Sequence, residues 1–222
     1  MSSIAHNRDI VRDVVRILCL VYYCGERNNQ AFLFVDDDKN YSHHINSELK
    51  LQKLDFWLRY PDHLALALLR LCQPNAPFAT QALDIQQIIA NIFTAEEPHL
   101  RWIPMQRFLH GAYEPLDRAM LFLSSRKLAY RKVDHSQPRT TYYLTMKGCT
   151  IVEQMARECL EIQWYIDRCQ LINRFFSDLN GFDIRKQQYL EPAYHQTPLN
   201  TTIAQVTASV RELYETTFGV PL

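Results

Sequence analysis

The chain has 222 residues, of which 47% are hydrophobic and 22% are charged. This length and composition allow one domain or two small ones, each with a real hydrophobic core, and argue against a disordered chain. Lys and Arg together number 24, as do Asp and Glu, so any affinity for nucleic acid must come from a local patch. The five glycines are fewer than we expect of an enzyme that cradles phosphates on glycine-rich loops.

The start of the chain carries charged residues, among them Arg8, Asp9 and Arg12, where a secretory signal needs an apolar run. No stretch reaches the length of a transmembrane helix. The six cysteines form no CxxC pair, and several occupy apolar positions of helical patterns, as reduced thiols do. We therefore expect a soluble, cytoplasmic protein with no membrane partner.

Helical spacing of apolar residues dominates the first part of the chain. We expect a helix over Ile10–Tyr22 that Gly25 ends, a second helix from about Ile45 to Arg59, and a third that Pro61 opens. Between the first two helices, Ala31–Val35 is either a short strand or a loop tucked against the core.

Further helices are expected from about Ala82 to Phe93 and, as a shorter element, from Trp102 to His110. Pro115 opens the next helix. The stretches Tyr130–Val133 and Thr140–Leu144 predict two strands joined by a polar turn, because threonine and tyrosine favour strands and proline and serine favour turns.

Thr145 is expected to cap the helix that follows these strands. Helix, strand, polar turn, strand and helix is the order of a helix-turn-helix unit with its wing. The stretch from about Leu83 to Ala156 resembles winged-helix regulators of the MarR and PadR type, in which an "LT..G" pattern, here Leu144, Thr145 and Gly148, starts the helix after the wing. A long apolar helical pattern then continues to about Leu179.

The sequence thus predicts a mainly α fold, with an N-terminal helical unit, a winged-helix domain with a two-stranded wing, and a long C-terminal helix with a tail. The expected ranges of these three parts are 1–75, 76–157 and 158–222 respectively.

A motif in the N-terminal part points to a family. "KLDFWLRYPDHLA", Lys53 to Ala65, is similar to an "LDFLLRYP.YLA" element in the middle components of ABC three-component, Lamassu-like prokaryotic defence systems. The resemblance covers the chain to about residue 180. It implies a non-catalytic accessory subunit that bridges an SMC-like ATPase and a nuclease-type effector in anti-phage and anti-plasmid defence.

The motif supplies four candidate partner-interface residues, Lys53, Asp55, Arg59 and Tyr60. Asp55 and Arg59 lie one helical turn apart, so a pair that braces the helix within the chain is the favoured interpretation. Alternatively, Arg59 binds a carboxylate of a partner in a bidentate manner.

No motif in the chain predicts catalysis. There is no Walker A loop, no HExxH and no nucleophile elbow. His43 and His44 beside Asp36–Asp38 suggest a metal site, but adjacent carboxylates in a turn point apart, so a solvated acidic loop is favoured. We expect no catalytic residues, no cofactor, no metal and no enzymatic activity; a small enzyme with dispersed catalytic residues is the least favoured alternative.

The predicted wing concentrates positive charge. Its candidate contacts to the DNA backbone are Arg126, Lys127, Arg131, Lys132, Arg139 and Lys147. Phosphate contact and a merely solvated wing explain this pattern equally well. The preceding helix begins with acidic residues, Glu114 and Asp117, and with Arg118 as its only base, which suits a protein partner or non-specific contact with double-stranded DNA better than base reading.

A dimeric winged-helix transcriptional regulator is the alternative function. In that interpretation the helix after the wing forms the dimer seam.

Overall fold

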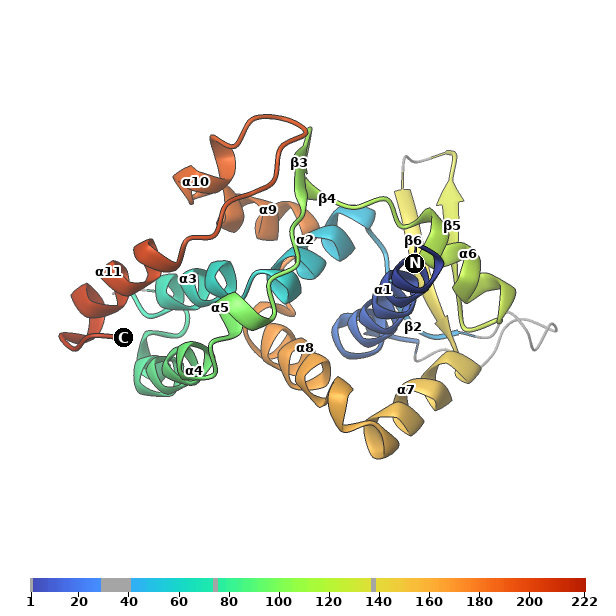
Figure 1. Cartoon of the computed structure of the whole chain (residues 1–222), viewed down its shortest axis with the longest axis horizontal. Helices are drawn as coiled ribbons and strands as arrows, with labels where there is room; N and C mark the ends of the chain where they lie inside the picture. The colour runs from blue at the N-terminus through green and yellow to red at the C-terminus, as the bar shows by residue number, and fades with distance from the viewer. Residues whose placement is uncertain (1, 29–40, 74–75, 137–138) are drawn as a thin grey trace. The chain divides into compact units, whose positions relative to one another are not determined.

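A computed structural model describes residues 2–28, 41–73, 76–136 and 139–222, with side chains from residue 10 onward. The described chain is mostly helical and contains a small four-stranded antiparallel sheet (Figure 1). The mainly α class expected from the sequence is therefore confirmed at this level. In the described part of the chain, every helix is too short or too polar to cross a membrane.

The chain divides into two compact units, and each unit combines two separate segments. Unit 1 comprises residues 1–55 and 114–182, and unit 2 comprises residues 56–113 and 183–222. This division groups the chain differently from the three continuous ranges expected from the sequence, because contacts join segments that are far apart in the chain.

Unit 1 is built from α1 (Ser2–Cys24), β1 (Glu26–Arg27), β2 (Tyr41–Ile45), most of α2 (Glu48–Arg59), α6 (Asp117–Ser125), β5 (Ala129–Asp134), β6 (Arg139–Thr145), α7 (Met146–Glu158), the 3-10 turn η3 (Leu160–Ile162) and α8 (Gln163–Phe176). The helix α1 lies at its centre and packs against α6, α7, α8 and the sheet. As expected, α1 ends just before Gly25, where a Cβ atom would lie 2.3 Å from the Val21 carbonyl oxygen.

The sheet of unit 1 has the strand order β1-β2-β6-β5, and all its pairs are antiparallel. The two strands predicted for the wing are confirmed as β5 and β6. Thr145 caps α7 as expected, since its side chain accepts the N–H of Gly148 at 3.0 Å. The sequence did not predict β2, whose pair His43–His44 lacks the apolar alternation of a strand.

The core of unit 1 encloses a charged pair. Arg16 on α1 is fully buried, its Nε donates to the carboxylate of Asp55, and its Nη1 lies 3.0 Å from Asp13. Burial lowers the pKa of Arg16, but the charges of Asp55 and Asp13 outweigh it and keep the guanidinium ionised.

Two helices, α7 and α8, follow the β5–β6 hairpin, and a short break separates them close to the expected boundary at residues 157 and 158. The helix α7 ends at Glu158, Cys159 is extended with φ −120° and ψ 100°, and η3 leads into α8. The apolar side of α8, with Ile166, Cys169 and Ile172, is buried, and α8 packs against α1.

Unit 2 is built from α3 (Pro61–Leu71), the 3-10 turn η2 (Ala79–Gln81), α4 (Ala82–Thr94), α5 (Glu97–Leu100), β3 (Gln106–Phe108), β4 (Gly111–Tyr113), most of α9 (Gly181–Tyr189), α10 (Pro192–His195) and α11 (Thr207–Phe218). Its central helix, α3, packs against α4, α5 and α11. Pro61 opens α3 at its first position, as expected from the sequence.

The short helix expected over Trp102–His110 is wrong. This part of the chain contains the β3–β4 hairpin, in which Gln106 pairs with Tyr113. A second segment holds the other edge of β3, because Arg107 donates its N–H to the carbonyl of Thr201 at 2.9 Å. Pairing with a segment so distant in sequence is invisible to local periodicity.

Ala31–Val35 and Asp36–Asp38, for which the sequence suggested a strand or loop and a turn, lie outside the described residues.

Candidate functional site

The β5–β6 hairpin is exposed toward its tip. The pairing of β2 with β6 ends at Ile45 opposite Tyr142, whereas β5 and β6 stay paired out to Asp134 opposite Arg139. The tip of the hairpin therefore extends beyond its neighbouring strand; Figure 1 draws β5 and β6 as adjacent arrows.

One face of this sheet carries aromatic and cationic side chains and is called here the outer face. Strand register places on it Tyr41, His44, Tyr130, Lys132, Thr141 and Tyr143. Tyr143 is central, with ring centroids 5.1 Å from stacked Tyr130, 4.6 Å from Tyr41 and 6.1 Å from His44. Burial raises the pKa of Tyr130 to about 12, so its hydroxyl keeps its proton at neutral pH.

A hollow of about 420 Å³ opens on the outer face toward the hairpin tip. Its lining includes Tyr41, His44, Lys132, His135, Arg139 and Tyr143. The acid Asp134 also lines it, but one oxygen of this carboxylate accepts the N–H and the hydroxyl of Ser136 at 2.9 and 2.6 Å. The hollow thus combines aromatic rings with cationic donors.

All six basic residues singled out in the sequence are exposed, but they do not form one cluster. Lys132 and Arg139 line the hollow on the outer face, and Arg139 Nε donates to the Asn46 carbonyl at 2.9 Å. Arg131 belongs to the opposite face of β5, where its Nη2 lies 2.6 Å from the carboxylate of Asp117 on α6.

The other three basic residues gather where α6 meets β5 and α7. Lys147 Nζ donates to the Arg126 carbonyl at 3.1 Å, and the Thr145 hydroxyl donates to the Lys127 carbonyl at 2.8 Å. Lys127 has φ 59°, a left-handed backbone conformation that favours glycine. A charged residue therefore occupies a tight turn in which glycine would have less backbone strain.

The exposed side of α6 carries large apolar residues together with the charged residues Asp117 and Arg118. Leu121 is 73% exposed and Phe122 36% exposed, and Asp117 lies in the first turn. A second hollow, of about 380 Å³, lies beside them and is lined by Asp117, Met120, Leu121, Ser124 and Arg131. Such a surface suits a protein better than a DNA groove.

The four motif residues proposed as a partner interface are interior residues. Lys53, Asp55, Arg59 and Tyr60 are each at most 3% exposed. Asp55 pairs with Arg16, and Arg59 donates to the carbonyls of Ile103 and Pro104 at 3.2 and 2.6 Å. Both residues thus bond to groups that are distant in sequence, in addition to any contact within their own helix. Burial leaves these side chains almost no surface for another protein, so the partner-interface interpretation is corrected.

Side chains of the motif from Tyr60 onward bond to main-chain groups of other segments of unit 2. The Tyr60 hydroxyl accepts the Met105 N–H at 2.9 Å and donates to the Ile203 carbonyl at 3.0 Å. Asp62 accepts the Val206 N–H, and His63 Nε2 donates to the Ala204 carbonyl at 2.9 Å. The motif therefore anchors two irregular segments against α3, a packing that no local sequence pattern predicts.

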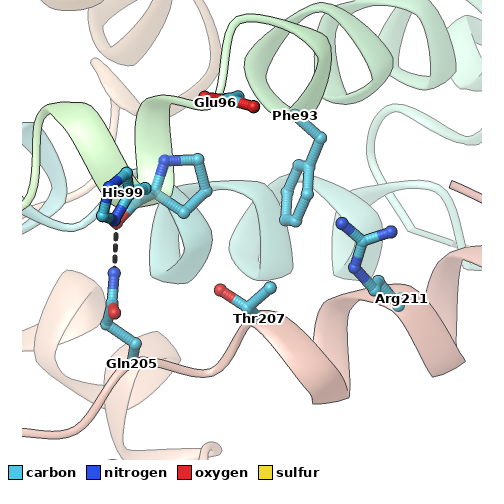
Figure 2. Close-up of a pocket in the computed structure, with 7 residues that line it drawn as sticks. Phe93, Glu96, His99, Gln205, Thr207 and Arg211 are labelled. Carbon is cyan, nitrogen blue, oxygen red and sulfur yellow. Dashed lines mark hydrogen bonds between the residues drawn. The ribbon is translucent and has the colours of Figure 1, made fainter.

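A pocket of about 270 Å³ in unit 2 was not predicted from the sequence. Figure 2 shows Phe93 and Glu96 facing Thr207 and Arg211 of α11 across it. The Arg211 guanidinium lies 5.5 Å from the Phe93 ring centroid and donates to the Leu222 carbonyl at 2.6 Å. Gln205 and Arg211 donate to main-chain carbonyls, and the lining carries charges of both signs, so the geometry of this pocket selects no ligand class.

Cys149 and His43 lie near each other, as a nucleophile and its base do in some enzymes. The Cys149 Sγ lies 3.6 Å from His43 Nδ1. Both side chains are buried, and burial raises the pKa of the Cys149 thiol and lowers that of His43. Both shifts favour the uncharged forms, a protonated thiol and a neutral imidazole. An activated cysteine nucleophile is instead a thiolate that substrate can reach, so this pair does not have the features of a catalytic site.

Within the described residues, no three His, Cys, Asp or Glu side chains are arranged to hold a metal ion. His43 and His44 lie on opposite faces of β2, and His44 Nε2 is 3.6 Å from the Glu26 carboxylate. Asp36–Asp38 lie outside the described residues.

Comparison with protein-family models, with characterised proteins and with solved structures finds no match to this chain.

Proposed function

We propose that this chain is a non-catalytic accessory subunit of a prokaryotic, Lamassu-like defence complex, in which it bridges an SMC-like ATPase and a nuclease-type effector and contacts DNA without reading its sequence. The exposed basic hairpin β5–β6 carries the DNA part of this proposal. The motif from Lys53 to Ala65 carries the family part.

Unit 1 is proposed to be a winged helix with an insertion. The order α1, β2 and α2, followed by α6, β5 and β6, supports this, with residues 56–113 inserted between α2 and α6. The Thr145 cap that starts α7 adds support, since it stands at the position expected from the wing resemblance. In this proposal the hairpin is the wing and α6 is the helix that would face a DNA groove.

Contact with duplex DNA is proposed to run through phosphates only. Phosphate contacts are electrostatic and carry no sequence information, and the hairpin offers cations on both of its faces, Lys132 on one and Arg131 on the other. The first turn of α6 exposes the acid Asp117, which the phosphates of a duplex repel, and the same helix exposes apolar Leu121.

The apolar side of α6 is proposed to bind a protein subunit. Leu121 and Phe122 are exposed large apolar residues beside a hollow, as in the centre of protein interfaces. In this proposal unit 1 contacts DNA through the hairpin and one protein subunit through α6.

The structure offers less support for a dimeric regulator. The proposed dimer seam was the helix after the wing, but the apolar side of α8 is buried and α8 packs against α1 of the same chain. A second copy would need another surface.

Affinity purification of the tagged chain from its native host tests the proposed role. We expect an SMC-like ATPase and a nuclease-type protein in stoichiometric amounts. Recovery of the chain only as a free homodimer on promoter DNA contradicts the proposal and favours the regulator.

A salt titration of binding to two unrelated duplexes tests the DNA contact. We expect equal affinities, and we expect Lys132→Gln to reduce the salt slope by about 1, as loss of one phosphate contact does. Arg131→Gln is expected to reduce the salt slope by less than Lys132→Gln does, because Arg131 is already paired with Asp117. A strong preference for one duplex that Arg118→Ala abolishes contradicts sequence-independent binding.

A further inference from the structure

The outer face of the sheet has features that phosphate contact with a duplex does not require. A cationic surface alone is enough to follow a duplex backbone. Here Tyr143 is surrounded by the rings of Tyr130, Tyr41 and His44, at centroid distances between 4.6 and 6.1 Å, beside a hollow of about 420 Å³. Aromatic side chains next to a basic groove are typical of proteins that bind unpaired strands.

We propose that this hollow binds an unpaired nucleotide, with its phosphate against Lys132 and Arg139 and its base against the rings of Tyr41 and Tyr143. This proposal rests on the proposed DNA contact. It adds that the outer face of the sheet binds a single nucleic-acid strand that has separated from its duplex.

The size of the hollow agrees with this ligand. Sites for small molecules have volumes of about 300 to 1,000 Å³, and the hollow lies within that range. A base pair in a duplex exposes only its edges, so it cannot place a base plane against a ring on a sheet surface. An unpaired base exposes both planes, and stacking tolerates every base.

The charges of the hollow also favour a nucleotide. Lys132 lies opposite Thr141 and Arg139 lies opposite Asp134. The Val133–Thr140 pair separates these two pairs, so both cations stand on the same face of the hairpin. Asp134 is the acid of this lining, and it accepts two hydrogen bonds from Ser136, which stabilise the turn. Arg139 is fixed through Nε to the Asn46 carbonyl, which orients its guanidinium for a phosphate.

Binding of labelled oligonucleotides to the full chain tests the proposal. The probes are oligo(dT), oligo(U) and a blunt duplex, each measured by fluorescence anisotropy. We expect Tyr143→Leu to weaken binding of a single-stranded probe about 10-fold, as loss of one stacked ring does, and to leave duplex binding unchanged. Tyr143→Phe keeps the ring and is expected to bind like the wild type. A further probe, oligo(dU), differs from oligo(U) in the sugar alone, so the ratio of these two affinities identifies the sugar that the hollow prefers.

Lys147→Gln provides a matched control, because Lys147 is an exposed cation of unit 1 outside the lining of the hollow. We expect Lys132→Gln to weaken single-strand binding more than Lys147→Gln does. Equal losses from the two variants overturn the proposal even if Tyr143→Leu fails to fold.

Photocrosslinking with an oligonucleotide that carries 5-iodouracil locates the base directly. Adducts on Tyr41 or Tyr143 support the proposal, and adducts confined to other residues overturn it. Duplex binding without single-strand binding overturns this inference and leaves the proposed function standing. Single-strand binding without duplex binding supports the nucleotide site and contradicts the proposed duplex contact. If neither probe binds, both the nucleotide site and the duplex contact are contradicted.

Discussion

Arg131 on β5 and Asp117 in the first turn of α6 form an ion pair with an Nη2–Oδ1 distance of 2.6 Å, although both side chains are largely exposed. The hydrogen bond to Asp117 raises the pKa of Arg131. The pair joins the hairpin to the preceding helix and neutralises one of the six basic residues expected to face DNA.

Release of Arg131 from this pair should strengthen DNA binding. Asp117→Asn removes a negative charge next to the hairpin, so we expect affinity for any duplex to rise about two- to threefold at low salt and the gain to shrink as salt is added. Asp178→Asn, an exposed acid of unit 1 outside this pair, is the control. The measurement is anisotropy at two ionic strengths. Unchanged or weaker binding of Asp117→Asn would mean that the pair positions the hairpin instead of masking it.

The exposed side of α6 should matter for the protein partner and not for DNA. We expect Leu121→Asp to lower recovery of the ATPase in affinity purification about 10-fold or more, because a charge replaces an apolar residue at a buried interface. Leu160→Asp is the matched control, since Leu160 is 89% exposed in the same unit. Equal recovery with both variants would remove α6 from the interface.

The buried ion pair of unit 1 should dominate stability. Asp55→Asn leaves the guanidinium of fully buried Arg16 without its main counter-charge, so we expect a loss of about 3 to 5 kcal/mol in the free energy of unfolding. Asp13→Asn removes the other, more exposed partner and should cost about 1 kcal/mol or less. Urea titration followed by circular dichroism measures both. A small effect at Asp55 would show that Asp13 alone compensates Arg16.

Acid should destabilise the fold through buried histidines. Burial lowers the pKa of His63 and, on β2, that of His43, so the folded chain favours both neutral imidazoles. The unfolded chain binds these protons first as pH falls. The stability is therefore complete above a pH of about 6.5, the unperturbed pKa, and is lost as pH drops toward the folded pKa values.

The urea midpoint measured between pH 7.5 and 5.5 checks this dependence. We expect His63→Gln to be less stable at pH 7.5, since it loses a fitted side chain that donates to the Ala204 carbonyl, but to lose less stability on acidification. His110→Gln, at an exposed turn, should follow the wild-type curve. A wild-type midpoint that does not fall toward pH 5.5 contradicts the histidine contribution.

The sequence by itself determined those helices and strands that depend on residues close together in the chain. Apolar spacing predicted α1 and α4, Pro61 fixed the start of α3, and Thr145 marked the start of α7. The strands β5 and β6 followed from threonine and tyrosine on either side of a polar turn. In each case the decisive interactions join residues close in the chain, so their pattern is visible without a fold.

For residues whose partners are distant in the chain, only the tertiary structure decided which side chains are buried and which share a face of the sheet. From the sequence, Arg59 and Tyr60 are candidates for either a brace within the chain or a partner interface, and in the structure the segments around Ile103 and Ile203 accept their hydrogen bonds. Likewise β2 forms because β6 offers it a free edge, and Lys132 shares a face with Tyr143 because of strand register. Burial and register depend on which chain segments meet, and that depends on the packing of the whole unit and not on neighbouring residues.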